Sequence, residues 1–346
     1  MAAKKSLSVT EIDRRLTNFD SILIPHPRLS DTHVRLSLLV AQTRSRITQH
    51  DQKLELAKGR PIKSAELWVQ PIVGPSGSGK SRALSTYVDD VYSSEETNET
   101  AIPVLIVTMR SSTRTPRQLQ SQILEAYKDP SASTVLTERD YSEAMVNEAI
   151  RKIARHRETN LVIIDEASNA LKGTHNQLSM AKAIKSLVND GLFSIVLAGT
   201  SAVNSLINCD PELMSRTKER IDFGRLRQNQ PDLRYFMDFV RDLENRMIQL
   251  QVMDNPIGLA TDIGACGAAY DMSEGVIGIV VRIFRIALER AFMSGKTSLD
   301  WETIALAFRA WKDTDDGLAK RYDPFVAGVK PDTIKIIEAI ARKAAA

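Results

Sequence analysis

Two stretches decide the fold: QPIVGPSGSGKSRAL at residues 70–84 and NLVIIDEAS at residues 160–168. The first has the spacing G-x-x-x-x-G-K-S, between a short apolar run and an amphipathic segment. Glycines at such a turn let successive backbone N–H groups point into one concavity at the start of a helix, where phosphate binds. The motif therefore predicts a phosphate-binding loop. Its residues are Gly74, Pro75, Ser76, Gly77, Ser78, Gly79, Lys80, Ser81 and Arg82.

Two side chains of this loop have predicted roles of their own. Lys80 would place a point charge at the β- and γ-phosphates, and the Ser81 hydroxyl would ligate Mg²⁺. The alternative is a plain turn rich in glycine and serine. Since a strand-like run precedes the motif and a helix-like segment follows it, we expect binding of ATP and Mg²⁺.

The second stretch supplies carboxylates. Four apolar residues precede Asp165, and ligands of open α/β sheets bind at the carboxyl ends of strands. Asp165 is therefore expected to hold Mg²⁺ together with Ser81, and Glu166 to orient the attacking water. The alternative is an Asp-Glu pair that caps a helix. An acid after the aspartate, and an apolar run between the two motifs, favour a hydrolytic ATPase over a kinase or a GTPase.

Two polar residues follow the apolar run in the stretch IVLAGTSAV at residues 195–203. Thr200, or Ser201, is a candidate to hydrogen-bond the γ-phosphate or the water. The alternative is a simple N-cap for the next helix, and both roles are compatible.

The fold class follows from alternation. Short apolar runs rich in β-branched residues indicate buried parallel strands, and the segments between them have helical periodicity. This pattern predicts an α/β fold with a three-layer α/β/α arrangement of a parallel sheet. The runs span residues 66–74, 102–109, 161–166, 193–200 and 220–226.

Four segments are expected along the chain. An N-terminal arm and a helix capped by Asp31 fill residues 1–59, and the α/β domain fills residues 60–228. Only helical patterns follow over residues 229–313, beginning after a cap at Asp232. Residues 314–346 form a tail that is expected to dock onto a partner.

Composition narrows the class of protein. The 346 residues are 43% hydrophobic and 26% charged, and the N-terminus lacks a signal sequence. No apolar run is long enough for a membrane helix. Cys209 and Cys266 are too few for a disulfide framework, so a cytoplasmic protein that does not enter a membrane is expected. A net charge of +3 does not by itself indicate nucleic-acid binding.

A local group of basic residues does suggest DNA. The stretch MRSSTRTPR at residues 109–117 spaces Arg110, Arg114 and Arg117 among hydroxyl side chains. Such side chains on a loop suit contacts with the phosphates of DNA, which fix position without reading sequence. An ordinary solvated loop is the alternative.

Together these motifs resemble an AAA+ ATPase, a P-loop NTPase of the additional-strand, catalytic-glutamate (ASCE) type with a small all-α lid. More narrowly, the chain is similar over about residues 30–310 to the TnsC/TniB family of transposition regulators. The segments that carry this narrower likeness are RPIKSAELWVQPIVGPSGSGKS (60–81), VTMRSSTRTPRQLQSQILEAY (107–127) and DPELMSRTKERIDFGRL (210–226).

The resemblance implies a protein that oligomerises on double-stranded DNA as a ring or a filament, with ATP between neighbouring subunits. It would link target selection to a transposase, and its target-selecting partner would be a DNA-binding protein or an RNA-guided complex. In that family the segment after the second strand contacts DNA, which here contains Arg110, Arg114 and Arg117.

The resemblance also assigns arginines to the nucleotide. Arg216 is the first choice, and Arg220 the second, for a side chain that reaches the phosphate of the next subunit. Thr217 stands where the family usually has an aromatic residue, so the choice stays open. A surface arginine that pairs with Glu212 or Glu219 is the alternative for both.

The lid should bring a second arginine to the nucleotide of its own subunit. Arg282 is the best match and Arg285 is next on the same predicted helix. The alternative is an arginine whose head merely reaches solvent from an apolar helix.

Two other functions share the nucleotide motifs. One is an initiator- or clamp-loader-type AAA+ ATPase of replication or repair. The other is a signalling NTPase that sequesters a protein partner and never touches DNA. The tail is expected to dock on a partner through Phe325 and the face of Ile334 and Ile337, or else to pack on its own domain.

Overall fold

The structure is a computed structural model that describes residues 7–93, 100–132, 142–171, 177–259, 261–314 and 319–345. The chain divides into two compact units. We call Pro27–Phe223 the α/β unit, and we call Met1–His26 together with Gly224–Ala346 the helical unit. This division differs from the four predicted segments, because the N-terminal residues are shared between the two units.

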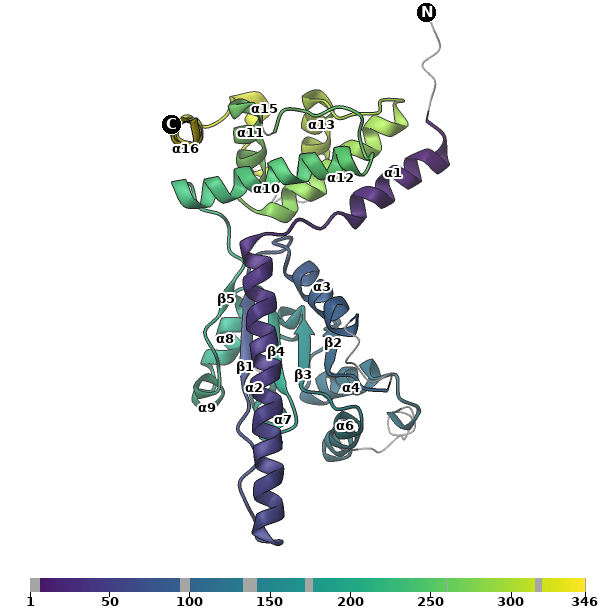
Figure 1. Cartoon of the computed structure of the whole chain (residues 1–346), viewed down its shortest axis with the longest axis vertical. Helices are drawn as coiled ribbons and strands as arrows, with labels where there is room; N and C mark the ends of the chain where they lie inside the picture. The colour runs from purple at the N-terminus through teal and green to yellow at the C-terminus, as the bar shows by residue number, and fades with distance from the viewer. Residues whose placement is uncertain are drawn as a thin grey trace, which may run out of the picture. The chain divides into compact units, whose positions relative to one another are not determined.

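The α/β unit is built on a parallel sheet of five strands with the order β2-β3-β4-β1-β5 (Figure 1). Each of the five apolar runs contains one strand. β4 lies between β1 and β3, so the strands that lead into the two decisive stretches are not neighbours, as the ASCE type requires. The strands are β1 (Val69–Val73), β2 (Val104–Thr108), β3 (Leu161–Asp165), β4 (Ser194–Gly199) and β5 (Ile221–Asp222).

Helices cover both faces of the sheet, because successive side chains of a strand point to opposite sides. Ile163 and Val196 belong to a core with α2 and α3, whereas Val162 and Ile195 belong to a core on the other face. The three predicted layers are therefore present. The helices of the first face are α2 (Pro27–Ala57) and α3 (Lys80–Tyr92). Those of the second are α4 (Pro116–Ala126), α6 (Glu143–His156), α7 (Gln177–Asn189) and α8 (Ala202–Asn208).

The connections place a ligand site between β1 and β4. The chain leaves β1 through α3 toward β2 at one edge of the sheet, and it leaves β4 toward β5 at the other edge. A crevice forms at the carboxyl ends of neighbouring strands whose connections diverge in this way. The residues that follow Val73 and Gly199 therefore lie at this switch point.

The helical unit has its own apolar core. Leu16 and Phe19 pack in the same core as Phe236 and Phe284, so the first helix belongs with the C-terminal helices rather than with α2. The unit consists of α1 (Val9–Ser21), α10 (Gln230–Gln249), α11 (Ile263–Ser273), α12 (Ile277–Met293), α13 (Trp301–Lys312), α15 (Pro324–Ala327) and α16 (Pro331–Ala345).

Both predicted helix caps are wrong, because each of the two aspartates lies inside its helix. α2 begins at Pro27, and Asp31 lies inside it, where its carboxylate pairs with Arg35 at 3.0 Å. α10 is capped by Asn229, whose side chain accepts the Asp232 N–H at 3.0 Å. Proline fits the first helical turn because its missing N–H has no partner to lose there.

The tail packs on its own unit, which corrects the prediction of a docking face. Ile337 is fully buried in the helical core, and Phe325 packs against the same core. The Thr333 hydroxyl donates to the buried Asp271 carboxylate at 2.8 Å. The burial of Ile337 favours the alternative, a tail that packs on its own unit, while Ile334 of the same predicted face is half-buried.

Candidate nucleotide-binding site

The loop between β1 and α3 has the backbone that the glycine motif predicts. Gly77 and Gly79 have φ angles of 76° and 95°, in the left-handed region that favours glycine. Gly74 lacks room for any side chain, because a Cβ there would lie 2.6 Å from the Phe223 carbonyl oxygen and 2.7 Å from Ser78 Oγ. The Gly74 N–H donates to the Gly199 carbonyl at 3.1 Å, which joins the loop to the end of β4.

The loop leads directly into the amino terminus of α3. Gly79 is the N-cap and provides no side-chain acceptor, so the first turn of α3 keeps N–H groups for another partner. Such a terminus favours anions through its N–H groups and the helix dipole. The side chains that flank it, Ser76, Ser81 and Arg82, are exposed, and Pro75 is half-buried.

Lys80 is folded back over this loop. Its Nζ donates to the carbonyl oxygens of Gly74 at 2.9 Å and Pro75 at 2.8 Å. Burial lowers the pKa of Lys80, while the charges of Glu166 and Asp165 act in the opposite direction. The predicted lysine and both predicted carboxylates are therefore brought into one site, although their sequence positions are far apart.

The two carboxylates differ in setting. Asp165 ends β3, is 5% exposed, and accepts the Glu166 N–H through Oδ1 at 2.8 Å. Glu166 is exposed and has a φ of 54°, a strained value for a residue with a side chain. Strain of this kind occurs often at functional sites, where the surrounding structure maintains it.

Thr200 ends β4 beside this pair, and its partner, Ser168, is a residue that the sequence reading missed. The Thr200 N–H and hydroxyl approach Ser168 Oγ at 2.7 and 2.9 Å. Ser168 fits because Gly199 has no side chain: a Cβ there would lie 2.4 Å from Ser168 Oγ. The capping alternative is weak, since the Ala202 N–H is 3.5 Å from Thr200 Oγ1 and Ser201 makes no side-chain cap.

The residues present fit a magnesium–nucleoside triphosphate. The close-packed glycine, the uncapped helix terminus and the buried lysine suit phosphate oxygens. One hydroxyl and one carboxylate, Ser81 and Asp165, suit Mg²⁺, which takes few protein ligands and keeps phosphate and water oxygens. When bound, the nucleotide supplies the phosphoryl group and Mg²⁺ neutralises its charge.

The stretch with the three arginines forms the loop between β2 and α4, which we call the arginine loop (residues 109–117). Arg110 pairs with Glu125 at 2.6 Å, so part of its charge is compensated. Arg114 is half-buried, and its Nη1 donates to the carbonyl oxygens of Thr113 at 2.7 Å and Asn169 at 3.3 Å. Arg117 is exposed. A hollow of about 670 Å³ lies over this loop and α4.

Arg216 and Arg220 lie in the segment that runs alongside β1 and leads into the edge strand β5. The Arg216 carbonyl accepts the Val69 N–H at 3.0 Å, so Arg216 is level with the amino end of β1. Arg220 directly precedes Ile221, which pairs with Ile72 near the carboxyl end of β1.

The alternative pairing for these two arginines is not what the structure shows. Glu212 pairs with Lys185 at 2.9 Å and Glu219 approaches Arg35 at 3.5 Å. A hydrogen bond from Lys63 lowers the pKa of the Glu66 carboxyl, and the Arg216 charge adds to that effect.

The two lid candidates lie on α12 of the helical unit. Arg282 is exposed, whereas Arg285 is held by Asp20 at 3.0 Å and by Glu289 at 3.1 Å. This contrast leaves Arg282 as the better candidate for a nucleotide contact, as the sequence ranks them.

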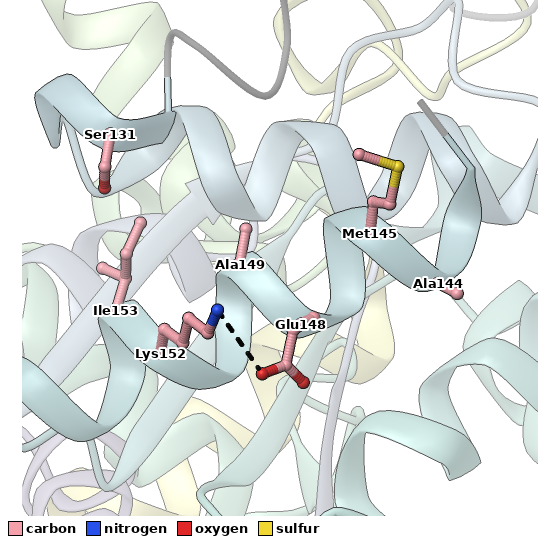
Figure 2. Close-up of a pocket in the computed structure, with 7 residues that line it drawn as sticks. All are labelled: Ser131, Ala144, Met145, Glu148, Ala149, Lys152 and Ile153. Carbon is pink, nitrogen blue, oxygen red and sulfur yellow. Dashed lines mark ion pairs between the residues drawn. The ribbon is translucent and has the colours of Figure 1, made fainter. Parts of the chain in front are cut away.

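A second hollow, of about 480 Å³, lies on α6, where Figure 2 shows Met145, Ala149 and Ile153 beside the Glu148–Lys152 pair. None of its lining residues belongs to the predicted nucleotide site. In the part of the chain that the structure describes, no helix is both long and apolar enough to cross a membrane.

Solved structures of other proteins share the fold of this chain. The chain is similar to the ORC2 protein of Aeropyrum pernix, solved in ADPNP-ADP complexes, with 16% identity over 84% of this chain and 71% of that one, at a TM-score of 0.55. It is also similar to the Aeropyrum pernix ORC1 protein in complex with DNA, with 17% identity over 90% and 71% of the two chains, at a TM-score of 0.57. The fold is therefore similar to that of AAA+ P-loop ATPases, which confirms the predicted fold class.

A family model gives a narrower likeness than the fold does. The family model of the bacterial TniB protein matches residues 53–221, so this part of the chain is similar to the TniB family, and the resemblance found in the sequence is confirmed. No curated protein sequence matches the chain.

Proposed function

We propose that this ATPase binds double-stranded DNA, oligomerises on it with ATP between subunits, and links target selection to the recruitment of a transposase. Hydrolysis would change how long the assembly persists on its target.

The nucleotide step uses the residues gathered at the switch point. Lys80 and the loop N–H groups bind the phosphates, and Ser81 with Asp165 holds Mg²⁺. Glu166 orients the water, and Thr200 fixes the water or the γ-phosphate from the end of β4.

The observation that carries the oligomer is the position of Arg216. It lies beside Val69, five residues of extended strand from Gly74, a span of about 16 Å along the sheet. An arginine at the amino edge of the sheet does not reach the phosphate loop at the carboxyl edge of its own domain. It is placed to act on a neighbouring copy, as arginine fingers supplied in trans do.

The arginine loop supports the DNA step. It combines two exposed arginines, Arg110 and Arg117, with hydroxyl side chains around an open hollow, and this chemistry suits phosphate contacts without sequence reading. Because the net charge is only +3, one copy would bind DNA weakly. Several copies joined by ATP multiply the contacts, which raises the affinity without any new type of contact.

A mixed-subunit assay tests the shared site. Glu166→Gln should bind ATP without hydrolysing it and still offer Arg216, whereas Arg216→Ala should keep its own pocket but offer no arginine. Each variant alone should lose about 10³-fold in turnover. An equal mixture should recover activity at roughly one quarter of its interfaces, if subunits assemble at random in a closed ring.

Arg220→Ala in the same mixture decides between the two candidate arginines. If the mixture stays inactive although both variants bind nucleotide and assemble, the site is not shared between subunits. Electron microscopy with duplex DNA, with and without ATP, then shows whether the oligomer exists at all.

The fold likeness favours one other candidate, an initiator-type ATPase of replication or repair, because the two Aeropyrum pernix proteins share this architecture. The family match favours transposition instead. Binding of the ATP-loaded oligomer to a purified transposase, compared with a replicative helicase, separates the two.

A further inference from the structure

The residue after Asp165 is held in an unusual conformation by its neighbours. Glu166 has a φ of 54°, which disfavours any residue with a Cβ. Its N–H donates to Asp165 Oδ1, and its carbonyl accepts the Asn169 N–H at 2.8 Å. The orientation of Glu166 therefore depends on where Asn169 lies.

Asn169 is also bonded to the arginine loop at two points. Its Nδ2 donates to the Met109 carbonyl at 3.1 Å, and its own carbonyl accepts from Arg114 Nη1 at 3.3 Å. The Met109 N–H in turn donates to the Asp165 carbonyl at 2.9 Å. Asn169 therefore makes hydrogen bonds both to Glu166 and to the arginine loop, and it joins the loop to the segment that carries Glu166.

The other side of the arginine loop is fixed to α4. Gln122 is 7% exposed; its Oε1 accepts the Arg110 N–H at 3.0 Å, and its Nε2 donates to Thr113 Oγ1 at 2.5 Å. Gln118 Oε1 accepts the Arg114 N–H at 2.6 Å. The arginine loop is therefore held on the α4 side as well as at Asn169.

We propose that Asn169 is a positioning residue that couples occupancy of the arginine loop to the orientation of Glu166. The inference rests on the proposed function, since the occupant is the phosphate backbone of duplex DNA. A phosphate oxygen is a stronger acceptor for a guanidinium than a carbonyl oxygen. A DNA phosphate would therefore compete with the Asn169 carbonyl for the Arg114 guanidinium. Loss of that bond would shift Asn169, and the hydrogen bond from the Asn169 N–H to the Glu166 carbonyl would pass the shift to Glu166.

The test compares ATP hydrolysis with and without duplex DNA in Asn169→Ala and Asn169→Asp. Alanine removes the donor to Met109, and aspartate keeps the shape of asparagine but cannot donate while ionised. In both variants, the increase in the turnover number that duplex DNA causes should be about fivefold smaller than in the wild type. A factor of this size corresponds to the loss of one hydrogen bond. The KM for ATP, the Kd for duplex DNA and the Tm should stay close to those of the wild type.

Asn245→Ala is the matched control, because Asn245 is exposed on α10 of the helical unit. Its stimulation by DNA should equal that of the wild type. If both Asn169 variants keep full stimulation, the coupling role is overturned while the proposed function stands. If the wild type does not bind duplex DNA, both fail together. If Asn169→Ala lowers the Tm and Asn169→Asp does not, the stimulation by DNA measured in Asn169→Asp decides whether the coupling role holds.

Discussion

The phosphate loop and the arginine loop follow neighbouring strands in sequence, β1 and β2, and they are built in different ways. The phosphate loop is fixed by contacts within the loop, where Lys80 Nζ bonds to carbonyls five and six residues earlier. The arginine loop is fixed by side chains from other elements, Gln122 of α4 and Asn169 after β3. Apart from the bond of the Gly74 N–H to the Gly199 carbonyl, the phosphate loop depends mainly on its own atoms, whereas the shape of the arginine loop depends on other elements.

This contrast separates two tasks in the proposed cycle. A self-contained loop suits phosphate binding, because a preorganised set of donors loses no free energy on rearrangement. A loop bonded to the segment of Glu166 suits regulation, because its occupant acts on a second site. Variants that affect the two loops differently can break this distinction or sharpen it.

Lys80→Ala should have the largest effect. It removes the charge that binds the phosphates, and charged hydrogen bonds of this kind contribute enough to weaken nucleotide binding about 100-fold. Titration with a fluorescent nucleotide measures the change. Lys182→Ala, at an exposed position of α7, is the matched control. Wild-type affinity in Lys80→Ala would show that the loop is not a phosphate site. Assembly on DNA should be lost with it.

Reversing the charges of Arg110, Arg114 and Arg117 to glutamate should have the next largest effect. Duplex binding should weaken, and the slope of log K against log salt should become shallower by about 2.7 if all three contact phosphates. Nucleotide affinity should be kept, because these residues lie outside the phosphate loop. Fluorescence anisotropy over a salt series gives both quantities.

A control triple, Arg44, Arg241 and Arg342 to glutamate, changes the net charge equally at exposed positions. If both triples weaken binding to the same extent, the effect is one of total charge and not of the arginine loop. If transposition continues although the first triple no longer binds DNA, the function is instead that of an NTPase that sequesters a protein partner.

The sheet was predictable because each strand is a short, nearly continuous apolar run. β3 fills residues 161–165 of the predicted 161–166, and β4 fills residues 194–199 of the predicted 193–200. Burial on both faces gives such strands a strong local signal. The same holds for the phosphate loop, whose glycines have a steric reason that sequence spacing reveals.

The partners of the site residues were not predictable. Ser168 approaches Thr200 across 32 residues, and Arg114 bonds to Asn169 across 55. No local pattern marks these pairs, because they depend on how β2, β3 and β4 align. The grouping of α1 with the C-terminal helices was not predicted for the same reason. Leu16 and Phe19 give α1 an apolar face, but the sequence does not show which core this face packs into.

Gln122→Leu should have the smallest of the three effects, and it acts on the arginine loop alone. Leucine has a similar size but leaves the Arg110 N–H and the buried Thr113 hydroxyl without this partner. Leaving such groups unpaired costs about 1–3 kcal/mol in the free energy of unfolding, which chemical denaturation measures. Gln52→Leu, at an exposed position of α2, should change it by less than about 0.5 kcal/mol. Nucleotide affinity should be unchanged in both, because the phosphate loop holds its own shape. A loss of nucleotide affinity in Gln122→Leu would show that the two loops are not independent in structure and would remove the distinction drawn between them.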